Sequence, residues 1–247
     1  MGRVLVKPRL RAPTWIDSAE AARRLGSADW DPPASGTVYG VILNVRQQLE
    51  SLAGAMDRPP YGKPPTFPVL YIKPPNTFLP HGGEVPVPVD VEALETSPTL
   101  AVVIGRTATR VPEAAAMDHV LGYAVAIDVC IPHANLHRPA IRQRCRDGFL
   151  PIGPWVTPRE AIADPDRLAV TVRVNGEETL RWSTADLVRP VAPLIAAVTD
   201  FMTLAEGDVL LVGLAPDGPQ ARVGDSVEAE IEGVGRLACT LAPEDAA

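Results

Sequence analysis

The chain has 247 residues, with 23 Lys and Arg against 30 Asp and Glu, which gives a formal net charge of −7. A mildly acidic chain lacks the basic footprint that nucleic acids and anionic membranes require, so both classes of partner are excluded. Hydrophobic residues make up 46% of the sequence, a share that excludes wholesale disorder. A fold of this size buries roughly 70–75% of its unfolded surface and needs no disulfide or structural metal.

The three cysteines are widely spaced and form no CxxC motif or Cys/His cluster, so neither a disulfide framework nor a zinc site is expected. The four histidines also lack the spacing of metal ligands. The sequence has no apolar run of about 18 residues, and its first residues have no apolar stretch of signal-peptide length. We therefore expect a cytoplasmic protein without a membrane span.

The 27 prolines and 19 glycines are the unusual feature of the composition. Proline is excluded from helix interiors and central strands, so the chain must be built from short elements joined by many turns. This excludes a helical bundle and favours an α+β fold that is mainly β, with a few short helices. We expect residues 1–36 to form an N-terminal arm or small lid, and residues 37–247 to form the main domain.

The first half of the chain is predicted to contain short strands and few helices. In the arm, Ser18 is expected to cap a helix over 18–25. The apolar runs predict strands at 37–43, 69–72, 84–89, 99–104 and 120–129, with 84–89 as an edge strand because of its prolines. Helices are predicted over 44–56 and 112–117.

In the second half, residues 130–155 are expected to form a long irregular segment, which in a compact domain is often functional. Residues 168–174 and 179–183 predict a hairpin, because Asn175-Gly176 between them is a preferred turn pair. A helix over 191–204, a strand directly after Gly207-Asp208 and a closing hairpin of 227–231 and 236–241 complete the prediction.

Three groups of residues could carry chemistry. Lys73 ends a strand, and it is either a lysine that reaches solvent or an ammonium at a pocket mouth that binds a carboxylate or stabilises an enolate. Asp128 is the one charge in the run 120–129, so it must pair, bind a metal, cap a turn or face a cleft. The segment 138–147 holds four arginines, which form either a solvated turn or a clamp for a dicarboxylate.

A series of motifs, in a fixed order from about Gly40 onward, resembles the fumarylacetoacetate hydrolase family. The motifs are GVILN, YIKPPNTF, LAVVIGR, GYAVAIDV, CRDGFLPIGPWV, FMTLAEGDVLLVG and GDSVEAEIEGVGRL. They cover about 200 residues. The resemblance implies the mixed β-roll of that family's C-terminal domain and an assembly of two or more subunits.

The resemblance also implies a site for a divalent cation, held by a Glu-x-Glu pair and an Asp, which are hard oxygen ligands. In this sequence the Asp position is Asp128, but the two Glu positions are Ser97 and Thr99. The family's histidine base falls at Gln48, and a family lysine falls at Arg144. We therefore expect no metal ligand set in this chain; Mg²⁺ or Mn²⁺ would bind only weakly at Asp128 or through a partner subunit.

The segments RPAIRQRCRDGFLPIG, LNVRQQL and YIKPPNTF are similar to the isomerase/decarboxylase branch of the family, which acts in 4-hydroxyphenylacetate degradation. This implies an enzyme subunit that isomerises 2-hydroxyhepta-2,4-diene-1,7-dioate, decarboxylates 5-oxopent-3-ene-1,2,5-tricarboxylate, or both. Both compounds are small polycarboxylates. The residues expected to act in catalysis are Lys73, Asp128 and Arg144, and those expected to bind substrate are Arg46, Asn76, Arg142 and Asp147.

Two alternatives remain open at the level of the sequence. The chain could be a catalytically silent paralogue that stabilises a metal-binding partner subunit, since the family's metal and base positions are replaced. It could also be an acylpyruvate-type hydrolase that cleaves a C–C bond with an atypical metal site. The expected assembly is a homo-oligomer, or a hetero-oligomer with a paralogous subunit of the C-terminal type.

Overall fold

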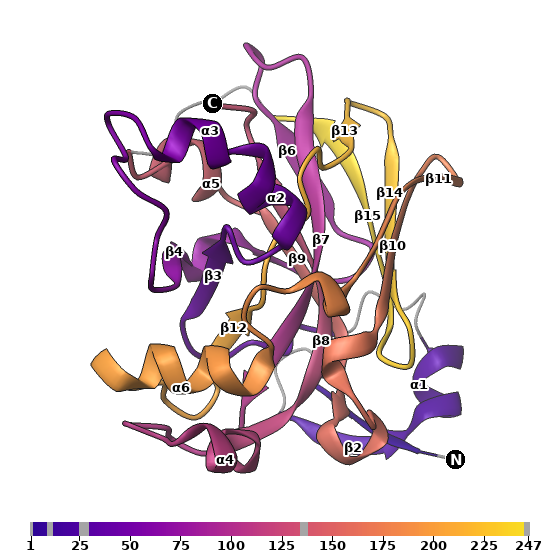
Figure 1. The fold of residues 1–247 in the computed structure, drawn as a ribbon. Helices are drawn as coiled ribbons and strands as arrows, with labels where there is room; N and C mark the ends of the chain where they lie inside the picture. Colours follow the sequence, from indigo (N-terminus) through magenta and orange to yellow (C-terminus); the bar gives the residue numbers. More distant parts are fainter. Residues whose placement is uncertain (1, 9–11, 25–29, 134–137, 245–247) are drawn as a thin grey trace.

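The computed structural model describes residues 2–8, 12–24, 30–133 and 138–244; Asn135 and His137, in the predicted irregular segment, lie outside these ranges. The described chain forms two β-sheets with short helices around them, which confirms the mainly β, α+β fold class (Figure 1). The strands are β1 (Arg3–Val6), β2 (Thr14–Asp17), β3 (Val38–Ile42), β4 (Val69–Lys73), β5 (Phe78–Leu79), β6 (Glu84–Val87), β7 (Leu94–Ile104), β8 (Val120–Cys130), β9 (Leu150–Pro158), β10 (Ala169–Val174), β11 (Glu177–Ser183), β12 (Val209–Leu211), β13 (Gln220–Ala221), β14 (Ser226–Ile231) and β15 (Gly235–Pro243).

The helices are α1 (Ser18–Arg23), α2 (Arg46–Ser51), α3 (Ala53–Met56), α4 (Glu113–Ala116), α5 (Ile141–Arg144) and α6 (Val191–Phe201). Short 3-10 turns lie in the connections at Pro75–Thr77, Met117–His119, Arg159–Ala161, Pro165–Arg167 and Thr184–Asp186. Within the described ranges, no helix has both the length and the apolar character that a membrane crossing requires.

The larger sheet has the strand order β2-β1-β9-β8-β7-β12-β3-β4, with β13 also paired to β7 and β5 to β9. The smaller sheet has the order β11-β10-β14-β15-β6. The predicted edge strand is β6, and it does lie at the edge of the smaller sheet, where a proline can withhold its N–H without breaking a ladder. The arm adds β1 to the larger sheet, beside β9.

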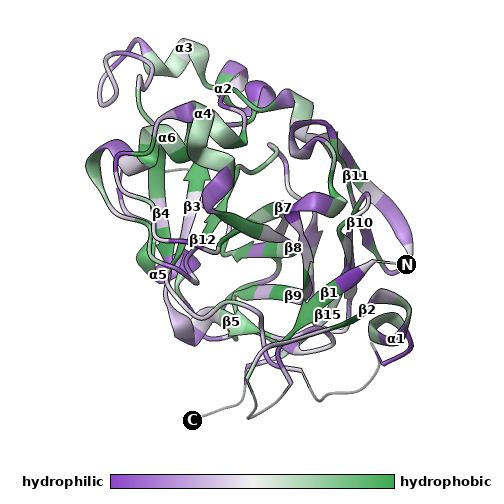
Figure 2. Cartoon of the chain, turned by 90° about the horizontal axis from the view of Figure 1, so that it is seen from below, coloured by the Kyte–Doolittle hydropathy of each residue, from purple (hydrophilic) through white to green (hydrophobic). Residues whose placement is uncertain are grey.

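The long strands β7 and β8 are buried along nearly their whole length. Figure 2 shows them in the middle of the molecule, among the other strands. Leu100 and Val102 of β7 belong to the core shared with the smaller sheet, whereas Ala101 and Val103 pack on the opposite face with residues of β3, β9 and β12. Two buried faces explain the continuous apolar runs from which both strands were predicted. β7 begins earlier than predicted and contains Pro98, which lies between the segments that pair with β13 and β12 and so interrupts neither ladder.

The hairpin prediction is confirmed: Asn175 and Gly176 both have positive φ angles between β10 and β11. The predicted helix over 44–56 is wrong in extent, since it is split at Leu52 into α2 and α3, with no side-chain cap at either start. The cap of α1 is Asp17, whose carboxylate accepts from two backbone N–H groups, and not Ser18.

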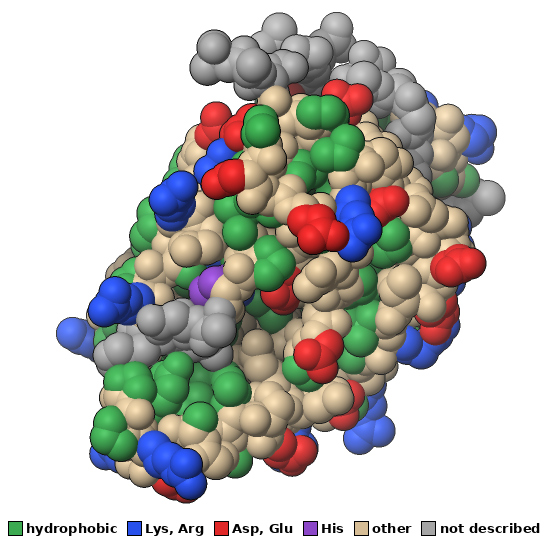
Figure 3. Space-filling model, turned by 90° about the horizontal axis from the view of Figure 1, so that it is seen from above, with side chains coloured by type: hydrophobic (Ala, Val, Ile, Leu, Met, Phe, Trp, Pro, Cys, Tyr) green, Lys and Arg blue, Asp and Glu red, His purple; other side chains and the backbone are tan. Residues whose placement is uncertain are grey.

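The prediction that residues 130–155 are irregular is wrong in part, because α5 and most of β9 fall in that segment. The sequence pattern did not predict β9 because this strand contains prolines. Pro154 is tolerated because the pairing of β8 with β9 shifts register between Tyr123 and Val125, so that Pro154 has no partner in that ladder. On the face shown in Figure 3, acidic, basic and hydrophobic side chains are interspersed, in keeping with the composition.

Candidate active site

Three residues that the sequence singles out meet in one buried group. Lys73 ends β4, Asp128 lies near the end of β8 and Arg144 ends α5. Lys73 Nζ and Arg144 Nη1 each lie 3.0 Å from Asp128 Oδ1. The exposed fractions of the three residues are 0%, 1% and 9% in chain order. We call Lys73, Asp128 and Arg144 the charge cluster.

The Lys73 ammonium is enclosed by oxygen atoms. Nζ donates to the carbonyl oxygens of Val129 at 2.7 Å, Arg144 at 2.8 Å and Phe149 at 2.9 Å. Burial lowers the pKa of Lys73, and the Asp128 carboxylate opposes that shift. Together with Asp128, four acceptors surround three N–H groups. This favours the charged form, because a neutral amine would turn its lone pair toward an oxygen.

Both alternatives for Lys73 are wrong: its side chain has no exposed surface, so it reaches neither solvent nor a pocket mouth. The backbone carbonyls of three separate segments converge on it, and only the folded chain brings them together. A buried ammonium that already has an acceptor for each N–H has no donor left for a substrate. In this structure Lys73 therefore acts on Asp128 and Arg144, which it contacts, and not on a substrate directly.

Tyr71 contacts the charge cluster, and the sequence analysis missed it. Its hydroxyl donates to Asp128 Oδ2, and the Arg144 guanidinium carbon lies 4.9 Å from the centre of its ring. Burial and the Asp128 carboxylate raise the pKa of Tyr71 well above its usual range, so the phenol keeps its proton. The available signal was the spacing in YIK, since residues 71 and 73 are two apart on a strand and share a face.

Gly40 on β3 makes room for the Tyr71 ring. The two residues are cross-strand partners, and a Cβ at position 40 would overlap the ring and hydroxyl of Tyr71. Gly40→Ala is expected to push the ring away from Asp128 and to destabilise the chain by roughly 1–3 kcal/mol, the usual cost of overpacking. The melting temperature and the near-ultraviolet circular dichroism of tyrosine measure these two effects.

Gly54→Ala is the matched control for this substitution, because a Cβ at position 54 of α3 meets nothing within 4 Å. We expect the control to melt at or slightly above the wild-type temperature, since alanine restricts the unfolded chain more than glycine does. A Gly40→Ala protein with wild-type melting and an unchanged tyrosine signal would contradict the role assigned to Gly40.

A cavity of about 370 Å³ opens beside the charge cluster, within the size range of small-ligand sites. Its wall comes from β3, from β4 and from the segment around α5, and most of it is apolar. Asp128 and Lys73 lie behind this wall. The polar side chains among the described residues that line the cavity are Tyr71, His133, Arg138, Arg144 and Cys145.

Arg144 lines the cavity, and most of its guanidinium N–H groups have no acceptor among the described residues. In the part of the chain that the structure describes, Asp128 is the one residue that accepts a hydrogen bond from it. Burial lowers the pKa of Arg144, but the surrounding groups that can carry negative charge, Asp128 foremost, together outweigh burial and the net shift is upward. The guanidinium has five N–H donors in a planar fork that matches a carboxylate, so it can hold Asp128 and a second anion together.

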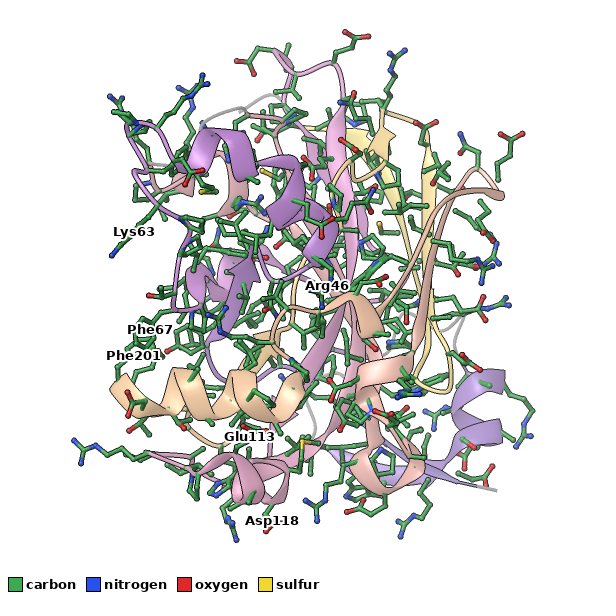
Figure 4. All side chains as sticks on the ribbon, in the orientation of Figure 1. Arg46, Lys63, Phe67, Glu113, Asp118 and Phe201 are labelled. Carbon is green, nitrogen blue, oxygen red and sulfur yellow. The ribbon has the colours of Figure 1, made fainter. Side chains whose placement is uncertain are left out.

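The four residues expected to bind substrate lie outside the cavity wall that the structure describes. Arg46 is exposed at the start of α2 (Figure 4), and Arg142 is exposed on α5. Asn76 and Asp147 are also exposed, and they contact each other, since Asn76 Nδ2 donates to Asp147 Oδ1 at 2.6 Å. Asn76 Nδ2 also donates to the Cys145 carbonyl at 3.1 Å, so this pair ties down the segment that carries Arg144.

The positions of the family's metal ligands do not fit a divalent cation. Ser97 lies opposite Asp128 in the β7–β8 ladder, but its hydroxyl is bonded to Glu95 at 3.1 Å. The Thr99 hydroxyl donates to the Gly213 carbonyl at 2.7 Å. Both Asp128 oxygens are already bonded within the protein. Among the described residues, no group of three His, Cys, Asp or Glu side chains could hold a metal ion.

Gln48, at the family's histidine position, has a structural contact: its Oε1 accepts from the Leu43 N–H at 2.7 Å. Leu43 has a positive φ angle of 62°, a conformation that a non-glycine residue adopts only with support. The amide of Gln48 therefore holds the turn between β3 and α2.

The fumarylacetoacetate (FAA) hydrolase C-terminal family model matches residues 37–242, so the chain belongs to this family. The bifunctional isomerase/decarboxylase of 4-hydroxyphenylacetate degradation from Salmonella dublin is 38% identical over 210 residues, which are 85% of this chain and 48% of that protein. Its counterpart from Escherichia coli is 41% identical over 202 residues, which are 80% of this chain and 45% of that protein. The chain thus spans about half the length of these relatives.

Other relatives have different names. A mitochondrial oxaloacetate tautomerase of Oryza sativa is 37% identical over 225 residues, 87% of this chain and 92% of that protein. The solved 5-carboxymethyl-2-hydroxymuconate delta-isomerase from Mycobacterium smegmatis is 28% identical with a TM-score of 0.73, covering 89% of this chain and 85% of that one. A fumarylpyruvate hydrolase from Pseudomonas aeruginosa, solved with Mn²⁺ and pyruvate, has a TM-score of 0.74 at 24% identity over 89% of this chain and 94% of that one, and it shares the fold.

Proposed function

We propose that this chain is an enzyme subunit of 4-hydroxyphenylacetate catabolism that acts on small polycarboxylates. It isomerises 2-hydroxyhepta-2,4-diene-1,7-dioate, decarboxylates 5-oxopent-3-ene-1,2,5-tricarboxylate, or both. The names of the relatives from Salmonella dublin and Escherichia coli support the pathway. The observation that carries the proposal is the Arg144 guanidinium, which Asp128 holds in the wall of a mostly apolar cavity and whose remaining donors are used by no residue that the structure describes.

The isomerisation moves one proton. The 2-hydroxyl loses a proton as C2–O becomes a carbonyl, and C5 gains one as the double bond shifts from C4–C5 to C3–C4. A group beside the substrate must therefore accept a proton and another must deliver one. Tyr71 lines the cavity, carries a proton and is bonded to the Asp128 carboxylate, so this pair is suited to the transfer.

In this scheme Arg144 binds the carboxylate next to the 2-hydroxyl and stabilises the negative charge that develops on the oxygen. Asp128 holds Arg144 and Tyr71 in place, and the Tyr71 hydroxyl relays the proton, accepting it from the 2-hydroxyl as it gives its own to C5. The apolar wall of β3 and β4 excludes water from the dienolate. Lys73 acts only through Asp128 and Arg144, so it is a positioning residue.

The direct test follows the ultraviolet absorption of 2-hydroxyhepta-2,4-diene-1,7-dioate with the purified chain. We expect the diene band to decay with saturable kinetics, because the cavity holds both a carboxylate-binding group and a proton-transferring pair. Release of CO₂ from 5-oxopent-3-ene-1,2,5-tricarboxylate, measured in parallel, assigns the half-reaction. Cleavage of an acylpyruvate C–C bond in place of both activities would favour the hydrolase.

A second candidate function is a silent subunit that stabilises a metal-binding paralogue. It is favoured by the Ser97, Thr99 and Gln48 side chains, whose polar groups are bonded within this chain. Such a subunit would show no turnover with either compound. It would raise the melting temperature or the activity of a metal-binding partner when the two are mixed, and this outcome would replace the enzymatic proposal.

A further inference from the structure

We propose that the charge cluster takes the place of the family's divalent cation, so that this cavity binds a 2-oxo or 2-hydroxy carboxylate directly on protein cations. The substrate class rests on the proposed function, but anion binding itself is measured independently of turnover. The ligand is a planar carboxylate with an oxygen on the neighbouring carbon. Arg144 contacts the ligand, and the buried Lys73 contributes the charge that makes the cluster positive overall.

The formal charges in the cluster sum to +1. Lys73 and Arg144 are cations, Asp128 is an anion, and the Tyr71 hydroxyl is neutral, since it donates its proton to Asp128 Oδ2 in a hydrogen bond. Without Lys73, Asp128 and Arg144 would form a neutral ion pair. With Lys73 on the same Oδ1 atom, the Asp128 charge is shared between two cations. The cavity therefore faces a net positive charge.

The position of that charge suits a ligand. The side chain of Lys73 is fully buried, whereas Arg144 lines the cavity with donors that no described residue uses. Most of the cavity wall is apolar, and an apolar surrounding strengthens the attraction between a guanidinium and a carboxylate. The Arg144 guanidinium carbon also lies over the Tyr71 ring, 4.9 Å from its centre, so one side of the guanidinium is covered.

A divalent cation would bind poorly at Asp128. Asp128 Oδ1 faces two cations and Oδ2 accepts from the Tyr71 hydroxyl, so the carboxylate would have to release a partner to bind metal. The hydroxyls of Ser97 and Thr99 are bonded elsewhere and carry no charge. Two further positive charges beside a cluster of net charge +1 would also be repelled.

The test uses oxalate, a stable planar dicarboxylate, and titration calorimetry with the full chain in EDTA. We expect saturable oxalate binding in EDTA and no added binding in excess Mn²⁺, with free Mn²⁺ followed separately by electron paramagnetic resonance. Arg144→Met is expected to weaken oxalate binding by about 10- to 100-fold, the usual effect of losing a charge-assisted pair. Arg167→Met is the control, because that arginine pairs with Asp164 on the surface and its side chain is 81% exposed.

The Asp128→Asn variant distinguishes oxalate binding on protein cations from oxalate binding through a metal ion. The asparagine keeps an oxygen for Lys73 and Arg144, and its NH₂ group can donate to the Tyr71 oxygen. If oxalate binds directly to the protein cations, removing the negative charge of Asp128 leaves oxalate binding unchanged or tightens it by up to about tenfold. A metal-mediated site would instead lose the one family ligand that this chain retains, and oxalate binding would disappear.

Each outcome decides between the two claims. Oxalate binding in EDTA without turnover of the dienedioate supports the cationic site and counts against the proposed enzyme. Oxalate binding that requires Mn²⁺, stoichiometric uptake of Mn²⁺ into the wild-type chain, or a more than tenfold loss in a folded Asp128→Asn protein overturns the cationic site. Absence of oxalate binding under all conditions also overturns it.

Discussion

Lys73→Met is expected to lower the free energy of unfolding by about 3–5 kcal/mol, the usual effect of removing one partner of a buried ion pair. The substitution removes the donor for the carbonyl oxygens of Val129, Arg144 and Phe149, and it takes one of two cations from Asp128. Because methionine is close to lysine in length, the loss would come from the missing polar contacts rather than from an empty cavity. Urea denaturation followed by circular dichroism measures the change.

Lys63→Met is the matched control, because Lys63 is exposed in the segment between α3 and β4 (Figure 4). We expect the control to unfold at the wild-type urea concentration. If Lys73→Met also unfolded there, the ammonium would contribute nothing net to stability. The buried contacts described for it would then have to be offset by the cost of removing it from water.

The second large effect is expected for Arg144→Met in turnover of the proposed substrate. Loss of a charge-assisted hydrogen bond of about 1.5–3 kcal/mol lowers kcat/KM by about 10- to 150-fold. Arg144→Lys keeps the charge but not the planar fork or the stacking on Tyr71, so an intermediate loss is expected. Steady-state kinetics on the dienedioate, with Arg167→Met as the surface control, provide the measurement.

Arg144 also holds Asp128, so the variant must first be shown to be folded, by its melting temperature and near-ultraviolet circular dichroism. A folded Arg144→Met protein with wild-type kcat and KM would remove Arg144 from the site. A rise in KM alone would indicate that the guanidinium binds substrate and transition state equally. A fall in kcat would indicate that it also stabilises the charge that develops during the reaction.

The candidate site was accessible to sequence analysis only in part. Lys73 and Asp128 were singled out as charges at or near the end of an apolar run. Arg144 was singled out because it lies in the arginine-rich segment 138–147 and at a family lysine position. The structure brings the three together. Tyr71 was missed, although it shares a strand face with Lys73, because an aromatic residue in a strand is ordinarily a packing residue. Its role depends on Gly40, a cross-strand partner 31 positions earlier by residue number.

The sequence by itself determined the local elements of this protein. Apolar runs, proline positions and the Asn175-Gly176 turn indicated most strands, because these signals act through neighbours along the chain. The mainly β class followed from the proline content, and the family followed from motifs in a fixed order. The replacement of two carboxylates by Ser97 and Thr99 was also visible in the residues alone.

Only the tertiary structure decided how those residues act. Lys73 was expected to reach solvent or a pocket mouth and is instead buried, because carbonyl oxygens of β8, α5 and the segment before β9 converge on its ammonium. Whether a charge faces solvent, a cavity or an ion-pair partner depends on which segments the fold brings within about 3 Å, the range of a hydrogen bond. That distance is set by packing between elements far apart in the chain, and no local pattern encodes it.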